Sequence, residues 1–240
     1  MSNRLNDSRG FTLPELVMAV AVGMVLLAAV TTAVVSGQRS STGIERKVTT
    51  NQDARAALEL MAAEIRMASF NSTFEPNLWR DPTNCNTAGN QNWRGIQEAT
   101  ATSITVEMDI ESNPSRTCGD TDGEIVRYAY DAANSRLTRE NIRCPGGRNA
   151  ANELPFLGPI AGQPGVRTVE VVNGALPVFR YYDGTGAEIP HANLPNDIPR
   201  IRRIEIALLV QSADVDPSTG QPRRMAYSTS VIPRNHGIQF

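Results

Sequence analysis

An uncharged stretch of 23 residues, from Leu16 to Gln38, constrains this chain more than any other feature. All 23 basic and all 25 acidic side chains of the 240-residue sequence lie outside it. About 20 apolar residues in a helix are long enough to cross a bilayer core of roughly 30 Å. The stretch therefore predicts a membrane-spanning helix, and Arg4 and Arg9 before it favour a cytoplasmic N-terminus.

A secretory signal peptide that is removed during export is the alternative interpretation of this stretch, because Ala28, Ala29 and Ala33 supply the small residues of a cleavage site. Two features argue against it. The apolar run is longer than the roughly 7–15 residues of a signal core. It also begins directly after Glu15, and a charge within a membrane helix costs about 2.5–3.5 kcal/mol at its centre, so a carboxylate at this edge suggests a function.

The residues around Glu15 resemble the class III signal of type IV pilins and type II secretion pseudopilins. The segment reads Arg-Gly-Phe-Thr-Leu-Pro-Glu from Arg9 to Glu15, and the uncharged helix follows it. The resemblance implies that a prepilin peptidase cuts after Gly10 and methylates the new amino terminus of Phe11. It also implies that Glu15 pairs with the amino terminus of a neighbouring subunit during assembly. A free α-amino group has a pKa of about 7.7–8.0, so the two opposite charges would offset each other's burial.

The helical pattern continues beyond the apolar stretch. Apolar residues recur every three or four positions at Ala54, Leu58, Met61, Ile65 and Ala68, which is the spacing of one helix face. The sequence therefore predicts one helix from about residue 13 to 69. We divide it into a leader (1–10), a transmembrane or filament-core helix (11–38) and an amphipathic second half (39–69).

The remainder predicts a head domain. Residues 70–102 are rich in asparagine and contain both tryptophans, which favours a loop. Residues 103–240 predict about seven antiparallel strands. Residues 104–110 alternate as a strand with one buried face. The predicted pairs are 124–130 with 136–142, 169–172 with 176–182 around Asn173-Gly174, and 202–211 with 225–232. The fold class is α+β, a long helix packed on an antiparallel sheet.

Three cysteines would lie in the oxidising periplasm, so at most one intramolecular disulfide forms and one thiol is left over. Cys118 and Cys144 bracket the 124–142 hairpin, whose antiparallel pairing brings its two ends together. We therefore predict a Cys118–Cys144 bridge, with Cys85–Cys144 as the alternative.

Several function classes are disfavoured by composition. The net charge of −2 argues against a nucleic-acid binder, which needs a basic face. Two histidines and no Cys-x-x-Cys pair leave little for a zinc site, and we find no catalytic grouping. The acidic turns 120–124 and 214–220 have carboxylates at a spacing of two, but neither fits an EF-hand loop. We therefore expect no metal site, no cofactor and no enzymatic activity.

Residues 56–68 and the closing segment 230–235 resemble the PilW-type minor pilins and the related J-type minor pseudopilins of type II secretion. This resemblance implies a structural subunit that initiates or primes a type IV pilus near its tip. Its partners would be the prepilin peptidase, other minor and major pilins or pseudopilins, and the inner membrane. The chain would cross that membrane once, with a periplasmic head, and then join the filament. The alternatives are a minor pseudopilin and, second, a membrane-anchored periplasmic enzyme or adhesin, the latter using the Asn-rich loop.

Overall fold

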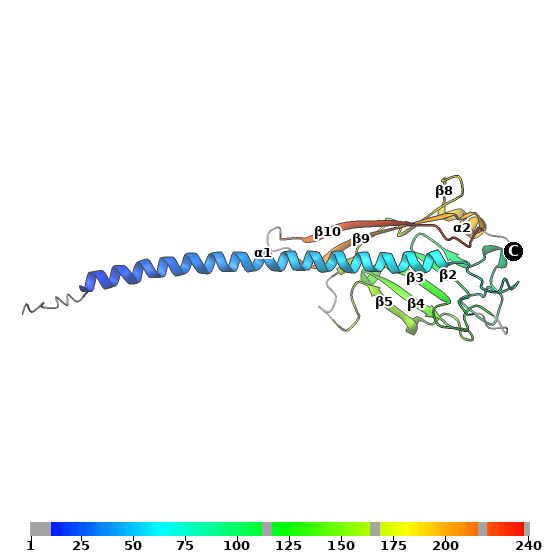
Figure 1. Ribbon diagram of the computed structural model, residues 1–240, viewed down its shortest axis with the longest axis horizontal. Coiled ribbons are helices and arrows are strands. Elements are labelled where there is room, and N and C mark those ends of the chain that lie inside the picture. The colour runs from blue at the N-terminus through cyan, green and yellow to red at the C-terminus, as the bar shows by residue number, and fades with distance from the viewer. Residues whose placement is uncertain (1–10, 112–116, 164–168, 216–219, 238–240) are drawn as a thin grey trace, which may run out of the picture. The chain divides into compact units, whose positions relative to one another are not determined.

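The computed structural model describes residues 11–111, 117–163, 169–215 and 220–237. The chain divides into two compact units, Met1–Glu45 and Arg46–Phe240. A 55-residue helix, α1 (Leu13–Met67), begins in the first unit and ends in the second (Figure 1). The helix ends two residues before the predicted position. Pro14 is tolerated because the first helical turn has no intrahelical N–H bond to lose.

The second unit contains two antiparallel sheets. The first is a five-stranded meander with the order β1-β2-β3-β4-β5. Its strands are β1 (Ile96–Ala99), β2 (Ser103–Glu107), β3 (Ile125–Asp131), β4 (Arg136–Ile142) and β5 (Glu153–Leu157). The predicted hairpin is confirmed as β3 and β4, with Asp131 paired to Arg136 at the turn. The segment 70–102 is not loop throughout, because it contains β1 and the short 3-10 helix η1 (Gln91–Trp93).

The second sheet is built around the long strand β9 (Arg203–Val215). Its order is β10-β9-β7-β8, and β6 also pairs with β9. The other strands are β6 (Val169–Val171), β7 (Phe179–Tyr182), β8 (Glu188–Ile189) and β10 (Pro222–Val231), and the short helix α2 (Leu194–Asp197) lies between β8 and β9. The predicted pairing of the last two strands is confirmed, with Val231 opposite Ile204.

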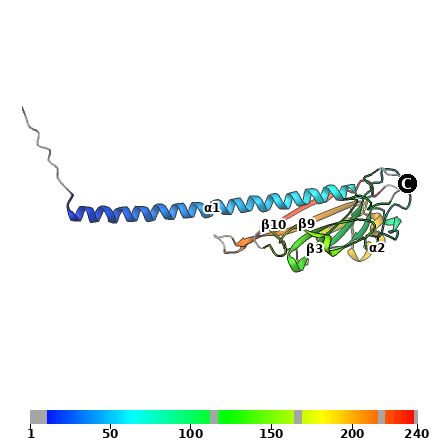
Figure 2. The same ribbon diagram turned by 90° about the horizontal axis from the view of Figure 1, so that it is seen from below.

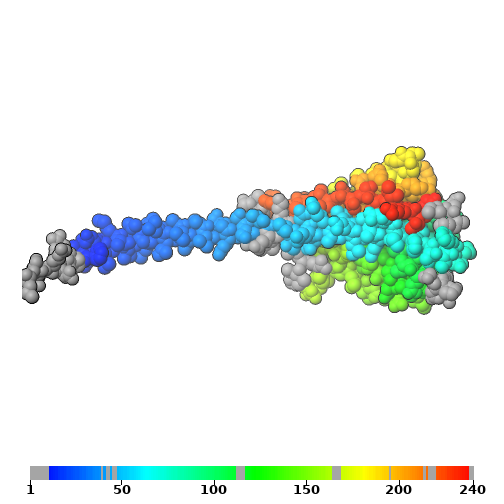
Figure 3. All heavy atoms as spheres, in the orientation of Figure 1, coloured from blue at the N-terminus to red at the C-terminus, as the bar shows by residue number. Residues whose placement is uncertain are grey.

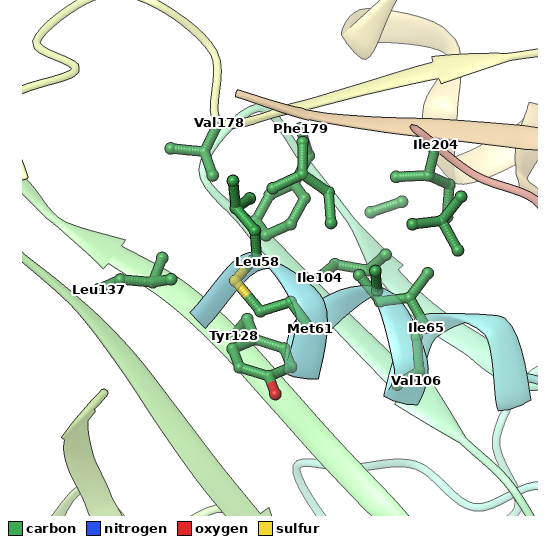
Figure 4. Packing of buried hydrophobic residues seen from close by; sticks show 14 of the residues in the cluster. Leu58, Met61, Ile65, Ile104, Val106, Tyr128, Leu137, Val178, Phe179 and Ile204 are labelled. Atoms are coloured by element: carbon green, nitrogen blue, oxygen red, sulfur yellow. The ribbon is translucent and has the colours of Figure 1, made fainter. Parts of the chain in front are cut away.

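The C-terminal part of α1 joins the two sheets. In Figure 1 the strands β9 and β10 lie above it and β3, β4 and β5 below it, and Figure 2 shows both groups of strands on the same side of the helix. The apolar face predicted at Ala54, Leu58, Met61, Ile65 and Ala68 forms a buried stripe. Leu58, Met61 and Ile65 of this stripe pack in one cluster with side chains from both sheets, including Tyr128 of β3 and Phe179 of β7 (Figure 4). The opposite face of this part of α1 stays at the surface (Figure 3), where Leu60 is 45% exposed.

The hairpin predicted around Asn173-Gly174 is wrong. β6 and β7 do not pair with each other; both pair with β9. The Asn173 side chain explains the difference, because it accepts a hydrogen bond from the Leu209 N–H (2.8 Å) and donates one to the Ala207 carbonyl (2.9 Å). The turn is thus tied to β9, and β6 and β7 pair with β9 one after the other, along the edge that β10 does not occupy.

The polar face predicted for residues 104–110 is also buried. Thr105 and Glu107 are both 0% exposed. The Thr105 hydroxyl donates a hydrogen bond to the Glu98 carboxylate. Glu98 also forms an ion pair with Arg127 across the sheet (2.8 Å). Glu107 accepts the Arg80 N–H, and its burial raises the pKa of its carboxyl well above the usual value. Long charged side chains therefore cover this face in place of solvent.

The C-terminal segment is held against the end of α1 by His236. Its Nε2 lies 2.8 Å from the Ile198 carbonyl, which can only accept, so Nε2 carries the proton. Nδ1 then accepts from the Ser69 hydroxyl at 3.0 Å, and the Ser69 oxygen in turn accepts the Gly95 N–H. The imidazole is neutral and fully buried. Burial, together with the nearby charges of Arg94 and Arg202, lowers the pKa of His236 to about 4, although the hydrogen bond to Ile198 opposes this shift.

We expect His236 to make folding dependent on pH. Its pKa is about 6.5 in an unfolded chain and about 4 in the fold, so the unfolded state takes up a proton first as the pH falls. The contribution of neutral His236 to the free energy of unfolding is fully present above pH ~6.5. It declines as the pH falls toward 4, by up to about 3 kcal/mol. Urea unfolding of the full chain in detergent micelles across this range measures the slope. A His236→Gln variant should lose that slope and a His191→Gln variant should keep it; an equal slope in both variants would contradict this assignment.

Candidate assembly site at the N-terminus

Glu15 lies in the first turn of α1 and folds back onto Thr12. Its Oε2 accepts the Thr12 backbone N–H at 2.9 Å and the Thr12 hydroxyl at 2.8 Å. A Thr followed three residues later by Glu is the sequence signature of a capping box, and half of that motif is formed here, because the Glu15 carboxylate satisfies the Thr12 N–H at the helix start. The sequence contains this signal, but sequence reasoning considered only the charge of Glu15 and missed the role of Thr12.

Residues around Glu15 form an exposed apolar surface. Phe11 is 89% exposed, Leu16 is 59% exposed and Leu27 is 66% exposed. Within the described ranges, one helical segment is long and apolar enough to cross a membrane, Leu13–Gln38, and none of it is buried. The predicted cleavage position after Gly10 lies outside the described residues, so only Phe11 and Glu15 of that assembly site can be placed. Glu15 is the acidic residue of the first helical turn, at the start of this apolar surface.

The predicted Cys118–Cys144 disulfide is wrong, and the alternative is found. Cys85 bonds to Cys144, across 59 residues of sequence. The hairpin does bring its ends together, but one residue away from the expected position, because the Cys144 N–H donates to the Gly119 carbonyl at 2.7 Å. A Cβ added at Gly119 would lie 2.7 Å from the Cys144 sulfur. The Cys118 thiol points elsewhere and contacts the Met108 carbonyl at 3.5 Å.

The acidic turn at residues 120–124 is closed by its own backbone. The Glu124 carboxylate accepts the N–H groups of Gly119 (2.9 Å), Thr121 (3.2 Å) and Ile110 (3.2 Å). Its oxygens are thus engaged without a cation. The second turn, 214–220, falls largely outside the described residues. Within the parts of the chain that the structure describes, no three His, Cys, Asp or Glu side chains are grouped to hold a metal ion.

The two cysteine environments lead to a direct chemical test. Burial, followed by the neighbouring charges of Glu107 and Glu124, raises the pKa of the Cys118 thiol well above its ordinary value. We expect alkylating reagents to leave Cys118 unmodified in the folded protein and to modify it after denaturation. Mass spectrometry of non-reduced peptides should find Cys85 linked to Cys144. A linked peptide that contains Cys118 would contradict the structure.

The comparisons with known proteins agree with the N-terminal geometry. Residues 5–31 match the family model described as the prokaryotic N-terminal methylation motif. No curated protein and no solved structure matches the chain. The match covers Phe11, Glu15 and most of the apolar segment, as far as Thr31, and the fold behind it is a long helix followed by antiparallel sheets. The chain thus carries the N-terminal methylation motif that is typical of type IV pilin-like proteins, on a long helix followed by antiparallel sheets.

Proposed function

We propose that this chain is a minor subunit of a type IV pilus, which initiates or primes the filament near its tip. A prepilin peptidase would first cut after Gly10 and methylate Phe11. The observation that supports the proposal most is the position of Glu15, an exposed carboxylate at the start of an exposed apolar helix that matches the methylation motif.

The geometry of Glu15 suits a charge pair between subunits. Both hydrogen bonds from Thr12 go to Oε2, and Oε1 accepts no hydrogen bond from any residue that the structure describes. Thr12 therefore orients the carboxylate while one oxygen stays available for an incoming amino group. Cleavage after Gly10 would create such an amino group on every subunit, and it would be cationic at neutral pH.

The energetics of assembly make this pair important. In the membrane the apolar segment contacts lipid tails, and in a filament it would contact the same segment of other subunits. Lipid tails are as apolar as leucine side chains, so this exchange yields little hydrophobic free energy. Packing and the Glu15 charge pair must then supply specificity, together with the work of an assembly motor.

The large head supports a minor rather than a major subunit. The unit from Arg46 to Phe240 carries ten strands in two sheets in its described parts, more than a repeating structural subunit needs for packing. A minor pseudopilin of type II secretion would use the same N-terminal residues and is the alternative. Within the described residues we find no metal group, and we assign no catalytic role to any side chain.

The charge of Glu15 can be separated from its capping role. Glu15→Gln keeps a side chain that can cap Thr12 but removes the charge, because Gln also completes a capping box. Expressed with the peptidase, wild type and variant should both begin with methylated Phe11. Recovery of the variant in sheared filaments should fall about tenfold or more, since a lost partner in a partly buried ion pair costs at least about 1.4 kcal/mol.

Two controls complete this experiment. Glu59→Gln removes an exposed carboxylate from the same helix, outside the apolar segment, and should be recovered at the wild-type level. Equal recovery of Glu15→Gln and wild type would refute the charge-pair role. An uncleaved N-terminus, or cleavage near Ala33, would refute the pilin-like processing itself. Loss of secretion with normal pili in a strain lacking the gene would favour the pseudopilin alternative.

A further inference from the structure

A polar cleft of about 990 Å³ lies at the end of the head where α1 ends. Such a volume is at the upper end of the range found for ligand clefts, roughly 300–1,000 Å³. Three parts of the chain form its walls: residues 69–79, residues 90–94 around η1, and a third wall in which Asn196 and Pro199 meet Asn235. These parts are distant in sequence and meet beside the C-terminal segment, near the end of α1 (Figure 1).

The walls of this cleft are braced by their own hydrogen bonds. Gln91 donates to the carbonyls of Trp79 (2.7 Å) and Gly89 (3.0 Å) and accepts the Trp79 N–H (3.2 Å). Asn71 accepts the Glu75 N–H and donates to the Glu75 carbonyl, which closes the turn between them. A cleft held in this way is preorganised, so a ligand does not have to order it on binding.

The third wall is attached to the other two by the C-terminal segment. Arg94 donates a hydrogen bond to the His236 carbonyl, while the His236 ring contacts Ser69 and Ile198 as described above. Asn235 precedes His236 and lines the cleft, and Asn196 and Pro199 lie on either side of Ile198. The contacts of His236 therefore connect the three walls of the cleft.

Four asparagine side chains line this cleft without partners. Asn77, Asn92, Asn196 and Asn235 form no side-chain hydrogen bond with any residue that the structure describes. Each amide offers one acceptor and two donors side by side. Unlike the braced Asn71 and Gln91, these four can exchange water for hydroxyl or amide groups of a ligand.

The aromatic and charged residues of the cleft narrow the ligand class. Trp79 and Trp93, the only tryptophans of the chain, both line it, and so does Phe74. Trp79 is only 8% exposed and packs in a buried cluster, so the half-buried Trp93 and the 63% exposed Phe74 are the rings that a ligand can reach. Aromatic rings present a negative face that attracts the slightly positive C–H groups of a sugar ring. The one cation, Arg94, is balanced by the one anion, Glu75, among the lining residues. A nearly neutral lining does not favour nucleic acids or phosphates, which require a net positive site.

We propose that this cleft binds a neutral glycan. Vicinal hydroxyls would pair with the donor and acceptor of the free asparagine amides, and a sugar face would lie against a tryptophan ring. This function is independent of filament assembly, because no residue of the cleft belongs to the N-terminal assembly site. It would give the head a binding activity of its own.

The two tryptophans provide a reporter that is specific to the cleft. The full chain is placed in lipid nanodiscs, which avoids detergents with sugar headgroups, and is screened on an array of neutral and acidic glycans. The neutral glycan with the strongest signal is then titrated against tryptophan fluorescence. We expect a saturable change in fluorescence. The double variant Asn92→Ala/Asn196→Ala should bind that glycan about 4- to 100-fold more weakly, since each of the two lost hydrogen bonds weakens binding by a factor of about 2–10.

The matched control is Asn193→Ala, which removes an exposed asparagine three residues from Asn196 that does not line the cleft. It should bind with wild-type affinity. No binding to any neutral glycan, or equal affinity in the double variant and wild type, would overturn the proposal. Binding restricted to acidic glycans would indicate an anion site, and a fluorescence response to a proline-rich peptide without any glycan response would indicate a protein-docking site; each would also overturn it.

Discussion

The buried stripe of α1 between Ala54 and Ala68 is the surface on which both sheets of the head depend. The two sheets share no strand pairing in the described parts of the chain, and each places its apolar residues on this stripe. Fully burying a side chain such as Leu58 or Met61 contributes roughly 1.5–3 kcal/mol. A helix that carried the same residues at a different spacing would leave one of the two sheets without a partner.

A polar contact fixes the position of α1 relative to the first sheet. Glu64 faces β4, where Arg139 donates to both of its oxygens (2.6 and 3.2 Å), and the Tyr128 hydroxyl also donates to it. The apolar stripe alone specifies the position of the helix less sharply, because hydrophobic contact is non-directional. A bidentate pair does not tolerate such a shift, since its geometry is directional. The same helix therefore presents an apolar surface in its first half and a specific, mixed surface in its second.

Sequence periodicity predicted the parts of this fold that depend on local pattern. The helix, the β3–β4 hairpin and the β9–β10 pair follow from spacing and turn residues, and the N-terminal motif was readable from consecutive residues. The failures all involve contacts between distant segments. Asn173 carries a strong turn signal, but its side chain pairs with β9. Cys118 lies one residue from the position that a bridge to Cys144 required, and only the register of the strands decides which residue is opposite.

The cleft could not have been predicted from the sequence. The asparagines of the 70–102 segment were visible, but Asn196 and Asn235 have no local pattern that links them to it. In the sequence, His236 is only one of two histidines and belongs to no recognisable motif. Its significance depends on burial and on partners 38 and 167 residues away, which no periodicity encodes.

The late position of β9, β10 and His236 has a consequence during synthesis. The apolar segment of α1 leaves the ribosome early and is ready for insertion, whereas the strands that cover the second half of the helix come from residues 203–231. Until those strands are made, the apolar stripe on α1 is covered only in part. Completion of the head therefore depends on synthesis of the last segment of the chain, and a chain that stopped before residue 203 would have no finished core.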